Sequence, residues 1–122
     1  MFDYQIGVFP VTQEGKVVLV TSRSGEYWIF PKGRRECDVE DYVVAGDEAY
    51  EEAGVLGKVW HDFKVFDVNS SKAPRLHVYP MQVEEVLQCW PEGDERERAI
   101  VSYKKAAKLL KKDLRAILHA MC

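Results

Sequence analysis

Three glutamates gather near the end of one predicted helix, and their spacing is the first chemical signal in this sequence. Glu48, Glu51 and Glu52 lie three and four residues apart, just before Gly54. At about 100° per residue, Glu51 lies about 60° to one side of Glu48 and Glu52 about 40° to the other, so they share one face. Like charges at these spacings weaken a helix. The face either meets water or holds a cation, and converging carboxylates suit Mg²⁺ or Mn²⁺.

The elements that position this face follow from apolar runs and turn residues. Two runs, 4–11 and 16–23, flank a glycine-containing loop and predict a β-hairpin. A third short strand ends at Pro31. A helix then follows, with Asp38 placed to cap it and Gly54 placed to end it.

The second half of the chain adds strands and a last helix. Two strand-like runs, 58–68 and 75–87, are separated by the turn-rich stretch 69–74. Pro80 cannot donate to a ladder, which predicts a bulge or an edge position in the second run. A brief strand at 99–101 precedes a helical pattern over 102–121. Strands, helix, strands and helix in this order predict an α/β fold with a mixed sheet.

The overall numbers exclude several classes of protein. The 122 residues suffice for a single domain, residues 1–122. A net charge of -3 argues against a nucleic-acid polymer as partner. No apolar run approaches the roughly 20 residues that span a bilayer, so no membrane partner is expected. The start of the chain lacks the features of a secretion signal, and the three cysteines form no CxxC pair; we expect a cytoplasmic protein.

The register around the glutamates resembles the signature of the Nudix hydrolase family. That signature runs Gly, five residues, Glu, seven residues, Arg-Glu, an apolar residue, any residue, Glu-Glu, any residue, Gly and an apolar residue. The positions in register are Gly33, Glu48, Ala49, Glu51, Glu52, Gly54 and Val55. The resemblance implies the Nudix α/β/α sandwich, a mixed β-sheet with a catalytic loop-helix and a C-terminal helix.

Two positions depart from the signature. Val39 occupies the slot of the first glutamate, and Asp47 occupies the slot of the arginine. In the family these two residues help to order the loop and to hold the metal-binding carboxylates. Asp47 instead adds an anion four residues before Glu51, which we expect to raise carboxylate pKa values and to increase dependence on a metal.

The resemblance also implies an activity, the metal-dependent hydrolysis of a phosphoanhydride bond. Glu48, Glu51 and Glu52 would bind Mg²⁺ or Mn²⁺ or act as the base, and the Gly33 carbonyl would add a ligand. Which glutamate deprotonates water stays open. Segments 28–33 and 87–98 resemble the diphosphoinositol-polyphosphate and diadenosine-polyphosphate branch, although the aromatic residue expected after Arg98 is missing. A small anionic substrate of one of these two kinds is expected, bound by a monomer or homodimer.

Anionic substrates need cations beyond the metal, and Arg binds phosphate bidentately. Taken singly, each basic residue is also an ordinary surface cation. The residues expected to bind phosphate, in or beside loops, are Arg23, Lys32, Arg34, Arg35, Arg75, Arg96 and Arg98. Two other interpretations stay open: a catalytically weakened domain that binds a nucleotide or a protein without turnover, and a hydrolase of damaged nucleoside triphosphates.

Overall fold

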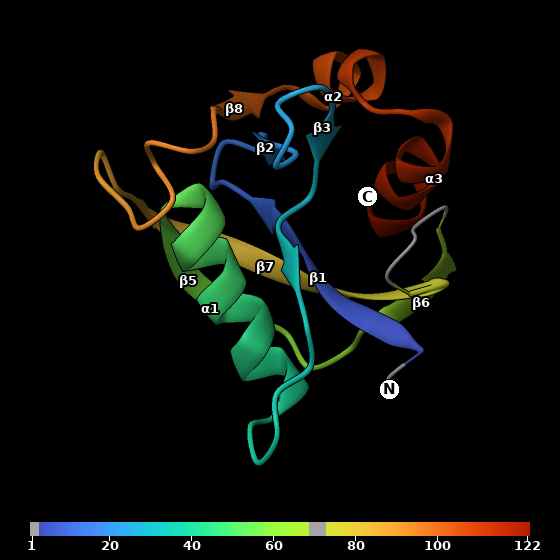
Figure 1. The fold of residues 1–122 in the computed structure, drawn as a ribbon. Helices are drawn as coiled ribbons and strands as arrows, with labels where there is room; N and C mark the ends of the chain where they lie inside the picture. Colours follow the sequence, from blue (N-terminus) through green and yellow to red (C-terminus); the bar gives the residue numbers. More distant parts are fainter. Residues whose placement is uncertain (1–2, 69–72) are drawn as a thin grey trace.

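Every strand of the protein belongs to one mixed sheet in the computed structural model, which describes residues 3–68 and 73–122 (Figure 1). The strands are β1 (Tyr4–Val11), β2 (Val17–Thr21), β3 (Trp28–Ile29), β4 (Lys32–Gly33), β5 (Val55–Val59), β6 (Lys64–Asp67), β7 (Arg75–Val86) and β8 (Arg98–Val101). The helices are α1 (Asp41–Ala53), α2 (Tyr103–Leu109) and α3 (Lys112–Met121).

The two longest strands form the centre of the sheet. β1 runs parallel to β7, while β2 and β4 pair antiparallel with β1. β3 and β8 both pair with β2, and β5 and β6 pair with successive parts of β7. The predicted mixed sheet and the hairpin of β1 and β2 are therefore confirmed.

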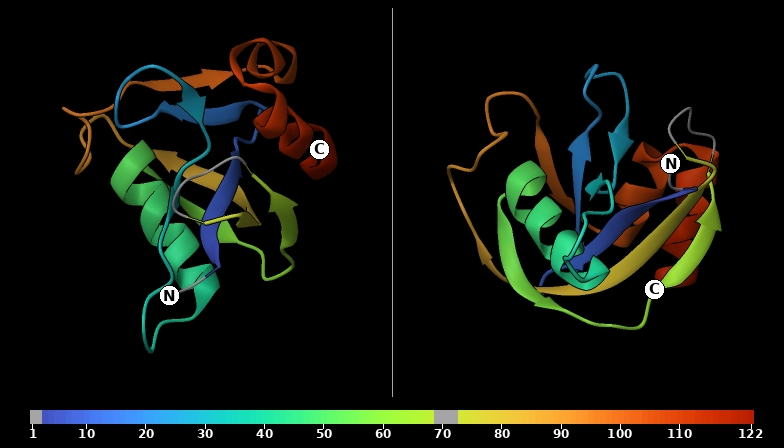
Figure 2. Two further views of the ribbon diagram at one scale, coloured as in Figure 1. Left: turned by 45° about the vertical axis from the view of Figure 1, so that its right-hand side comes forward. Right: turned by 60° about the horizontal axis from the view of Figure 1, so that its bottom comes forward.

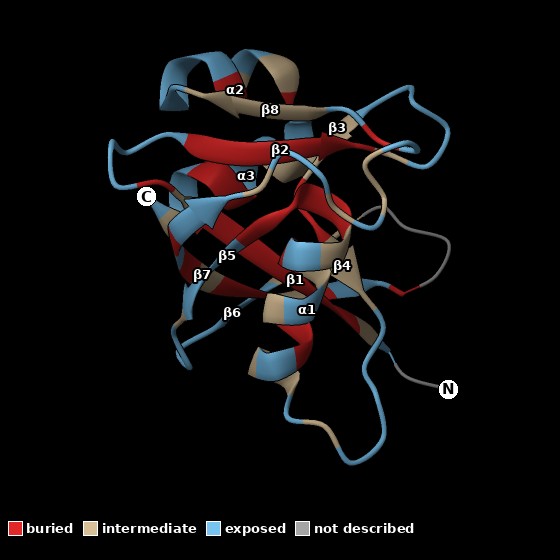
Figure 3. Cartoon of the chain, turned by 90° about the vertical axis from the view of Figure 1, so that its left-hand side faces the viewer, coloured by how far each residue is buried: buried red, intermediate tan, exposed pale blue. Residues whose placement is uncertain are grey.

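Helices cover both faces of this sheet (Figure 2). β2 shows why: Val18 and Val20 pack toward α1, while Val17 and Leu19 pack toward α2 and α3. Such a strand is apolar on both sides, and its residues are buried along its length (Figure 3). The predicted α/β/α sandwich is confirmed, with the loop before α1 and the helix itself on one face.

Pro80 lies in a central strand, so the predicted bulge or edge position is wrong. Its carbonyl accepts a hydrogen bond from the Trp60 N–H at 2.9 Å. Trp60 lies between the end of β5 and the start of β6, which together replace the single strand predicted over 58–68. The N–H and carbonyl of a strand residue point to the same side. The donor that proline lacks therefore faces the interruption between two short strands.

The C-terminal helical pattern also divides in two. Leu110 is buried with an extended backbone, φ -85° and ψ 145°, and forms a bridge with Trp28. The prediction of one helix over 102–121 was wrong, because the apolar spacing continues across a break that lets Leu110 reach the core. The break leaves Lys111 at the N-cap of α3.

The ends of α1 differ from each other in how well they were predicted. Asp38 does not cap the helix: it has a left-handed backbone, φ 61°, and Glu40 occupies the N-cap without a side-chain hydrogen bond. Gly54 ends the helix as predicted, with φ 64° and its N–H donating to Tyr50 O at 3.0 Å. The predicted turn at 69–74 falls largely on 69–72, outside the described residues. No described helix has the length and apolar character needed to cross a bilayer.

Candidate active site

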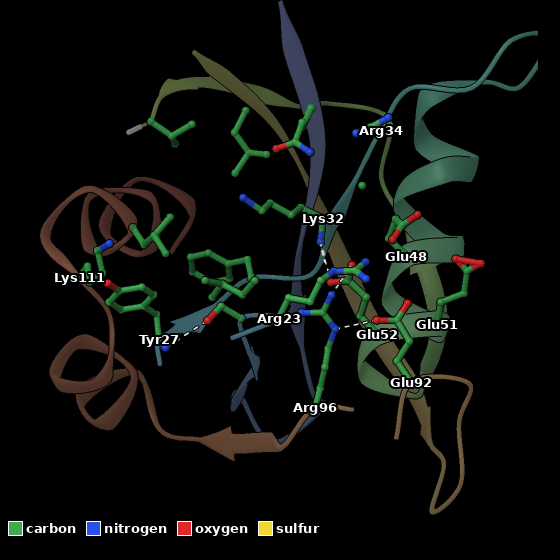
Figure 4. A pocket seen from close by; sticks show the side chains of 18 of the residues that line it. Arg23, Tyr27, Lys32, Arg34, Glu48, Glu51, Glu52, Glu92, Arg96 and Lys111 are labelled. Atoms are coloured by element: carbon green, nitrogen blue, oxygen red, sulfur yellow. Dashed lines mark hydrogen bonds and ion pairs between the residues drawn. The ribbon is translucent and has the colours of Figure 1, made fainter. Parts of the chain in front are cut away.

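A cavity of about 700 Å³ lies between α1, the sheet and the break that separates α2 from α3 (Figure 4). It gathers all four residues of the predicted metal site and four of the seven predicted phosphate-binding residues. These are Gly33, Glu48, Glu51 and Glu52, and Arg23, Lys32, Arg34 and Arg96. Carboxylates from α1 form one wall, and the cations come from loops and from β4.

Glu52 is the most firmly held carboxylate of this wall. The residue is 5% exposed, and its carboxylate oxygens accept hydrogen bonds from the Lys32 backbone N–H at 3.2 Å and from Arg96 Nη2 at 3.3 Å. Burial raises the pKa of Glu52 above its ordinary value, while the Arg96 guanidinium opposes that shift. Glu52 is thus fixed from both sides, by β4 and by the loop before β8.

Glu48 lies against the backbone of the loop strand β4. A Cβ added at Gly33 would lie 2.7 Å from Glu48 Cγ and closer still to its carboxyl group, so only glycine leaves room for this side chain. Burial, together with the charges of Glu52 and Glu51, raises the pKa of Glu48 to about 8. Gly33 therefore leaves room for Glu48, while burial and the neighbouring carboxylates disfavour its ionised form.

The pKa of Glu51 is affected directly by Asp47, the acid that stands in the arginine slot of the signature. Burial raises the pKa of Glu51, and the next largest cause is the Asp47 carboxylate, followed by Glu92 and Glu36. The expectation that Asp47 raises the pKa of a neighbouring carboxylate is confirmed. Glu92, which the sequence analysis did not single out, also lines the cavity.

The donor set suits a hard divalent cation, because every candidate ligand is an oxygen atom and the surplus negative charge already shifts pKa values upward. Within residues 3–68 and 73–122, no three His, Cys, Asp or Glu side chains are already gathered closely enough to hold an ion.

The end of the cavity away from the carboxylates is cationic and aromatic. Lys111 Nζ lies 4.0 Å from the centroid of the Tyr27 ring, both residues line the cavity, and Figure 4 shows them on the side away from the glutamates of α1. Sequence reasoning missed Lys111 because a continuous helix would have placed it on the solvated face. Only the break at Leu110 turns it toward the cavity.

Three predicted phosphate-binding residues lie outside this cavity, each with another partner. Arg35 lies 4.0 Å from Asp41, and Arg75 pairs with Asp3 at 2.5 Å. Arg98 donates to backbone carbonyls at the end of α1 and before β8, and stacks on an indole ring at 4.1 Å. Arg98 thus joins the end of α1 to the rest of the fold.

Curated Nudix hydrolases match most of this chain. It is 38% identical over 86 residues to human diphosphoinositol polyphosphate phosphohydrolase NUDT4B, which covers 70% of this chain and 48% of that protein. It is 36% identical over 91 residues to "Nudix hydrolase 17, mitochondrial" of Arabidopsis thaliana, 72% of this chain and 50% of that protein. The chain spans about half the length of the curated relatives it matches. No family model matches it.

The solved structure of a MutT protein from Methanosarcina mazei Go1 matches the fold with a TM-score of 0.71, over 97% of this chain and 91% of that one, at 16% identity. The chain is Nudix-like in sequence and fold. The predicted resemblance to the diphosphoinositol-polyphosphate branch is also confirmed by the human relative. Within this Nudix fold, Val39 replaces the first signature glutamate and packs against the apolar cluster beneath α1, so the loop is anchored there by apolar contact.

Proposed function

We propose that this chain is a metal-dependent pyrophosphohydrolase acting on a dinucleoside polyphosphate or a diphosphoinositol polyphosphate. The observation that carries the proposal is that one cavity is lined both by the carboxylate wall on α1 and by basic side chains, those of Arg23, Lys32, Arg34 and Lys111. A pyrophosphate with further anionic groups matches both kinds of lining, since the reacting bond needs metal and the remaining phosphates need cations.

The residues proposed to hold Mg²⁺ or Mn²⁺ are Glu48, Glu51 and Glu52, with the Gly33 carbonyl. When bound, the metal neutralises charge on the phosphoryl oxygens and activates water. Glu52 is kept in place by its bonds to Lys32 N and Arg96. Glu48 carries a proton at neutral pH in the absence of a cation, because burial raises its pKa to about 8. Binding a cation therefore releases a proton from this wall.

Phosphates remote from the reacting bond are proposed to meet Arg23, Lys32, Arg34 and Lys111, all of which line the cavity. Lysine acts there as a point charge and arginine as a bidentate partner. Relatives named as diphosphoinositol polyphosphate phosphohydrolases support the same substrate class.

The proposal is tested by phosphate release with Mg²⁺ or Mn²⁺ on a panel of compounds. The panel holds diadenosine polyphosphates, a diphosphoinositol polyphosphate, ADP-ribose, nucleotide sugars and nucleoside triphosphates. Glu52→Gln keeps the shape of the side chain and removes its charge, while Glu95→Gln makes the same change at an exposed position outside the cavity. Turnover that is lost in Glu52→Gln and kept in Glu95→Gln is the expected result.

A second candidate is a domain that binds such a compound without cleaving it, and Asp47 is the residue that favours it. Its carboxylate raises the pKa of Glu51, where the signature has a cation. Calorimetric binding of a panel compound with no turnover at any metal concentration would establish this candidate and reject the hydrolase.

A further inference from the structure

Arg96 is buried in the wall of the cavity, and its guanidinium bonds to three other residues of the fold. It is 8% exposed. Its Nε lies 2.7 Å from a Glu92 oxygen, its Nη1 donates to the Thr21 carbonyl at 2.8 Å, and its Nη2 donates to Glu52 at 3.3 Å. Figure 4 shows the guanidinium between these two carboxylates. A group used on all three nitrogens by the fold is poorly placed to receive a phosphate.

The backbone around Arg96 is itself tied to the end of β2. The Thr21 N–H donates to the Glu97 carbonyl, and the Glu97 N–H donates to the Thr21 hydroxyl, both at 3.0 Å. The backbone that carries the Arg96 side chain is therefore held in place against the sheet. The guanidinium joins β2, the loop before β8 and the carboxylate of Glu52 on α1.

We infer that Arg96 is a positioning residue for Glu52, supplying from the loop before β8 the cation that the helix lacks because Asp47 stands in the arginine slot. The inference rests on the proposed function for its catalytic meaning. Two observations carry it. The arginine slot of the signature holds an acid, Asp47. Glu52 instead forms a buried ion pair with Arg96, in which the Arg96 side chain is 6% exposed and the Glu52 side chain 7% exposed. Arg96 is thereby reassigned from the phosphate-binding role that the sequence suggested.

The role depends on the shape of the guanidinium as well as its charge. The planar fork presents five N–H donors in fixed directions, whereas a lysine ammonium is one flexible point charge. Lysine at this position would keep a positive charge near Glu52 and would lose the simultaneous bonds to Thr21 O and Glu92. Arg96→Lys therefore separates position from charge.

The test compares Arg96→Ala and Arg96→Lys with the unaltered protein in kcat, KM and Mn²⁺ affinity, the last by electron paramagnetic resonance of free Mn²⁺. Lys64→Ala is the control: Lys64 also donates to a backbone carbonyl, that of Ala120 at 2.8 Å, and lies outside the cavity. We expect both Arg96 variants to lose about 10- to 100-fold in kcat, the usual range for residues that orient metal ligands, with KM changed less than about threefold.

The direction of the change in Mn²⁺ affinity distinguishes a positioning role from a purely electrostatic one. Removing a cation beside a carboxylate strengthens cation binding by Coulomb's law, so a residue that only neutralises charge predicts tighter Mn²⁺ binding in Arg96→Ala. A positioning residue predicts weaker binding, by about tenfold or more. Tighter binding would overturn the inference.

The remaining outcomes are equally decisive. A raised KM with kcat preserved would make Arg96 a phosphate ligand, and Arg96→Lys indistinguishable from the unaltered protein would show that charge alone suffices; either result rejects the inference. If Arg96→Ala does not fold, as thermal melting would show, Arg96→Lys decides by the same measurements. If the unaltered protein cleaves nothing, the proposed function has failed, and the Mn²⁺ comparison still judges Arg96.

Discussion

Replacing Gly33 with alanine should disable the carboxylate wall while leaving the fold intact. The added Cβ would lie 2.7 Å from Glu48 Cγ, whereas non-bonded carbons settle at about 3.5–4.0 Å. Glu48 must therefore retreat by about 1 Å, and a misplacement of about 1 Å at a reacting centre costs about 100-fold in rate. Gly33 is not among the residues with positive φ, so alanine brings no backbone strain.

The assay is kcat for the best panel substrate, together with Mn²⁺ affinity and the melting temperature. Gly46→Ala is a matched control on α1, because its Cβ would meet Val59 at an ordinary 3.5 Å. In a Glu48→Ala background, Gly33→Ala should have no further effect, since the clash has lost its partner. A further loss of Mn²⁺ affinity or melting temperature in that background would refute the steric reasoning, as would full activity of Gly33→Ala alone.

Three further predictions concern pH, the cationic end and the end of α1. The folded, metal-free protein holds a proton on Glu48 more tightly than the unfolded chain, with a pKa of about 8 against 4.5. The contribution of Glu48 to stability therefore falls as pH rises between these two values. The melting temperature of the metal-free protein should fall over the same pH range, and saturating Mg²⁺ should reduce the fall. Lys111→Ala should raise KM by about tenfold with kcat kept, as expected for lost charge-assisted binding away from the reacting bond; a fall in kcat alone would contradict that placement. Trp90→Phe removes the indole N–H bond to Glu52 O, 2.9 Å long, and should lower the free energy of unfolding by about 1–2 kcal/mol in urea titrations.

The carboxylate wall could be predicted because helix geometry is local. Gly54 ends the helix, and the three glutamates before it share a face for reasons that need no tertiary contact. Gly33 was found only through its register with Glu48. No local pattern indicates that the Glu48 side chain, 15 positions away, occupies the space where a Cβ of residue 33 would lie. The resemblance therefore supplied a contact that spacing could not.

The cationic side of the site was harder to predict because it depends on tertiary partners. Arg75 and Arg96 are both arginines near strand ends, yet one pairs with Asp3 in solvent and the other is buried against Glu52. Composition and spacing do not separate them. Lys111 reaches the cavity only because the helix breaks where Leu110 is buried. The apolar repeat continues across that break, so the sequence pattern does not reveal it.

The three glutamates are not equivalent, and their differences favour a site that uses a cation. Glu52 already has Arg96 and a backbone N–H as partners, whereas burial and the neighbouring carboxylates Glu52 and Glu51 raise the pKa of Glu48 to about 8. A domain that never bound metal would gain stability by replacing Glu48 with a neutral residue, because the ionised form is disfavoured where it lies.

Glu48→Gln should therefore raise the melting temperature of the metal-free protein above neutral pH, where Glu48 is forced to ionise. The same change should weaken Mn²⁺ binding, because it removes a charged ligand from the wall. Glu95→Gln, at an exposed position, should alter neither. A metal-free protein that is less stable as Glu48→Gln at high pH would mean that the ionised carboxylate is satisfied by the fold. Glu48 would then need no cation, and the physical reason to prefer a hydrolase over a binding domain would be lost.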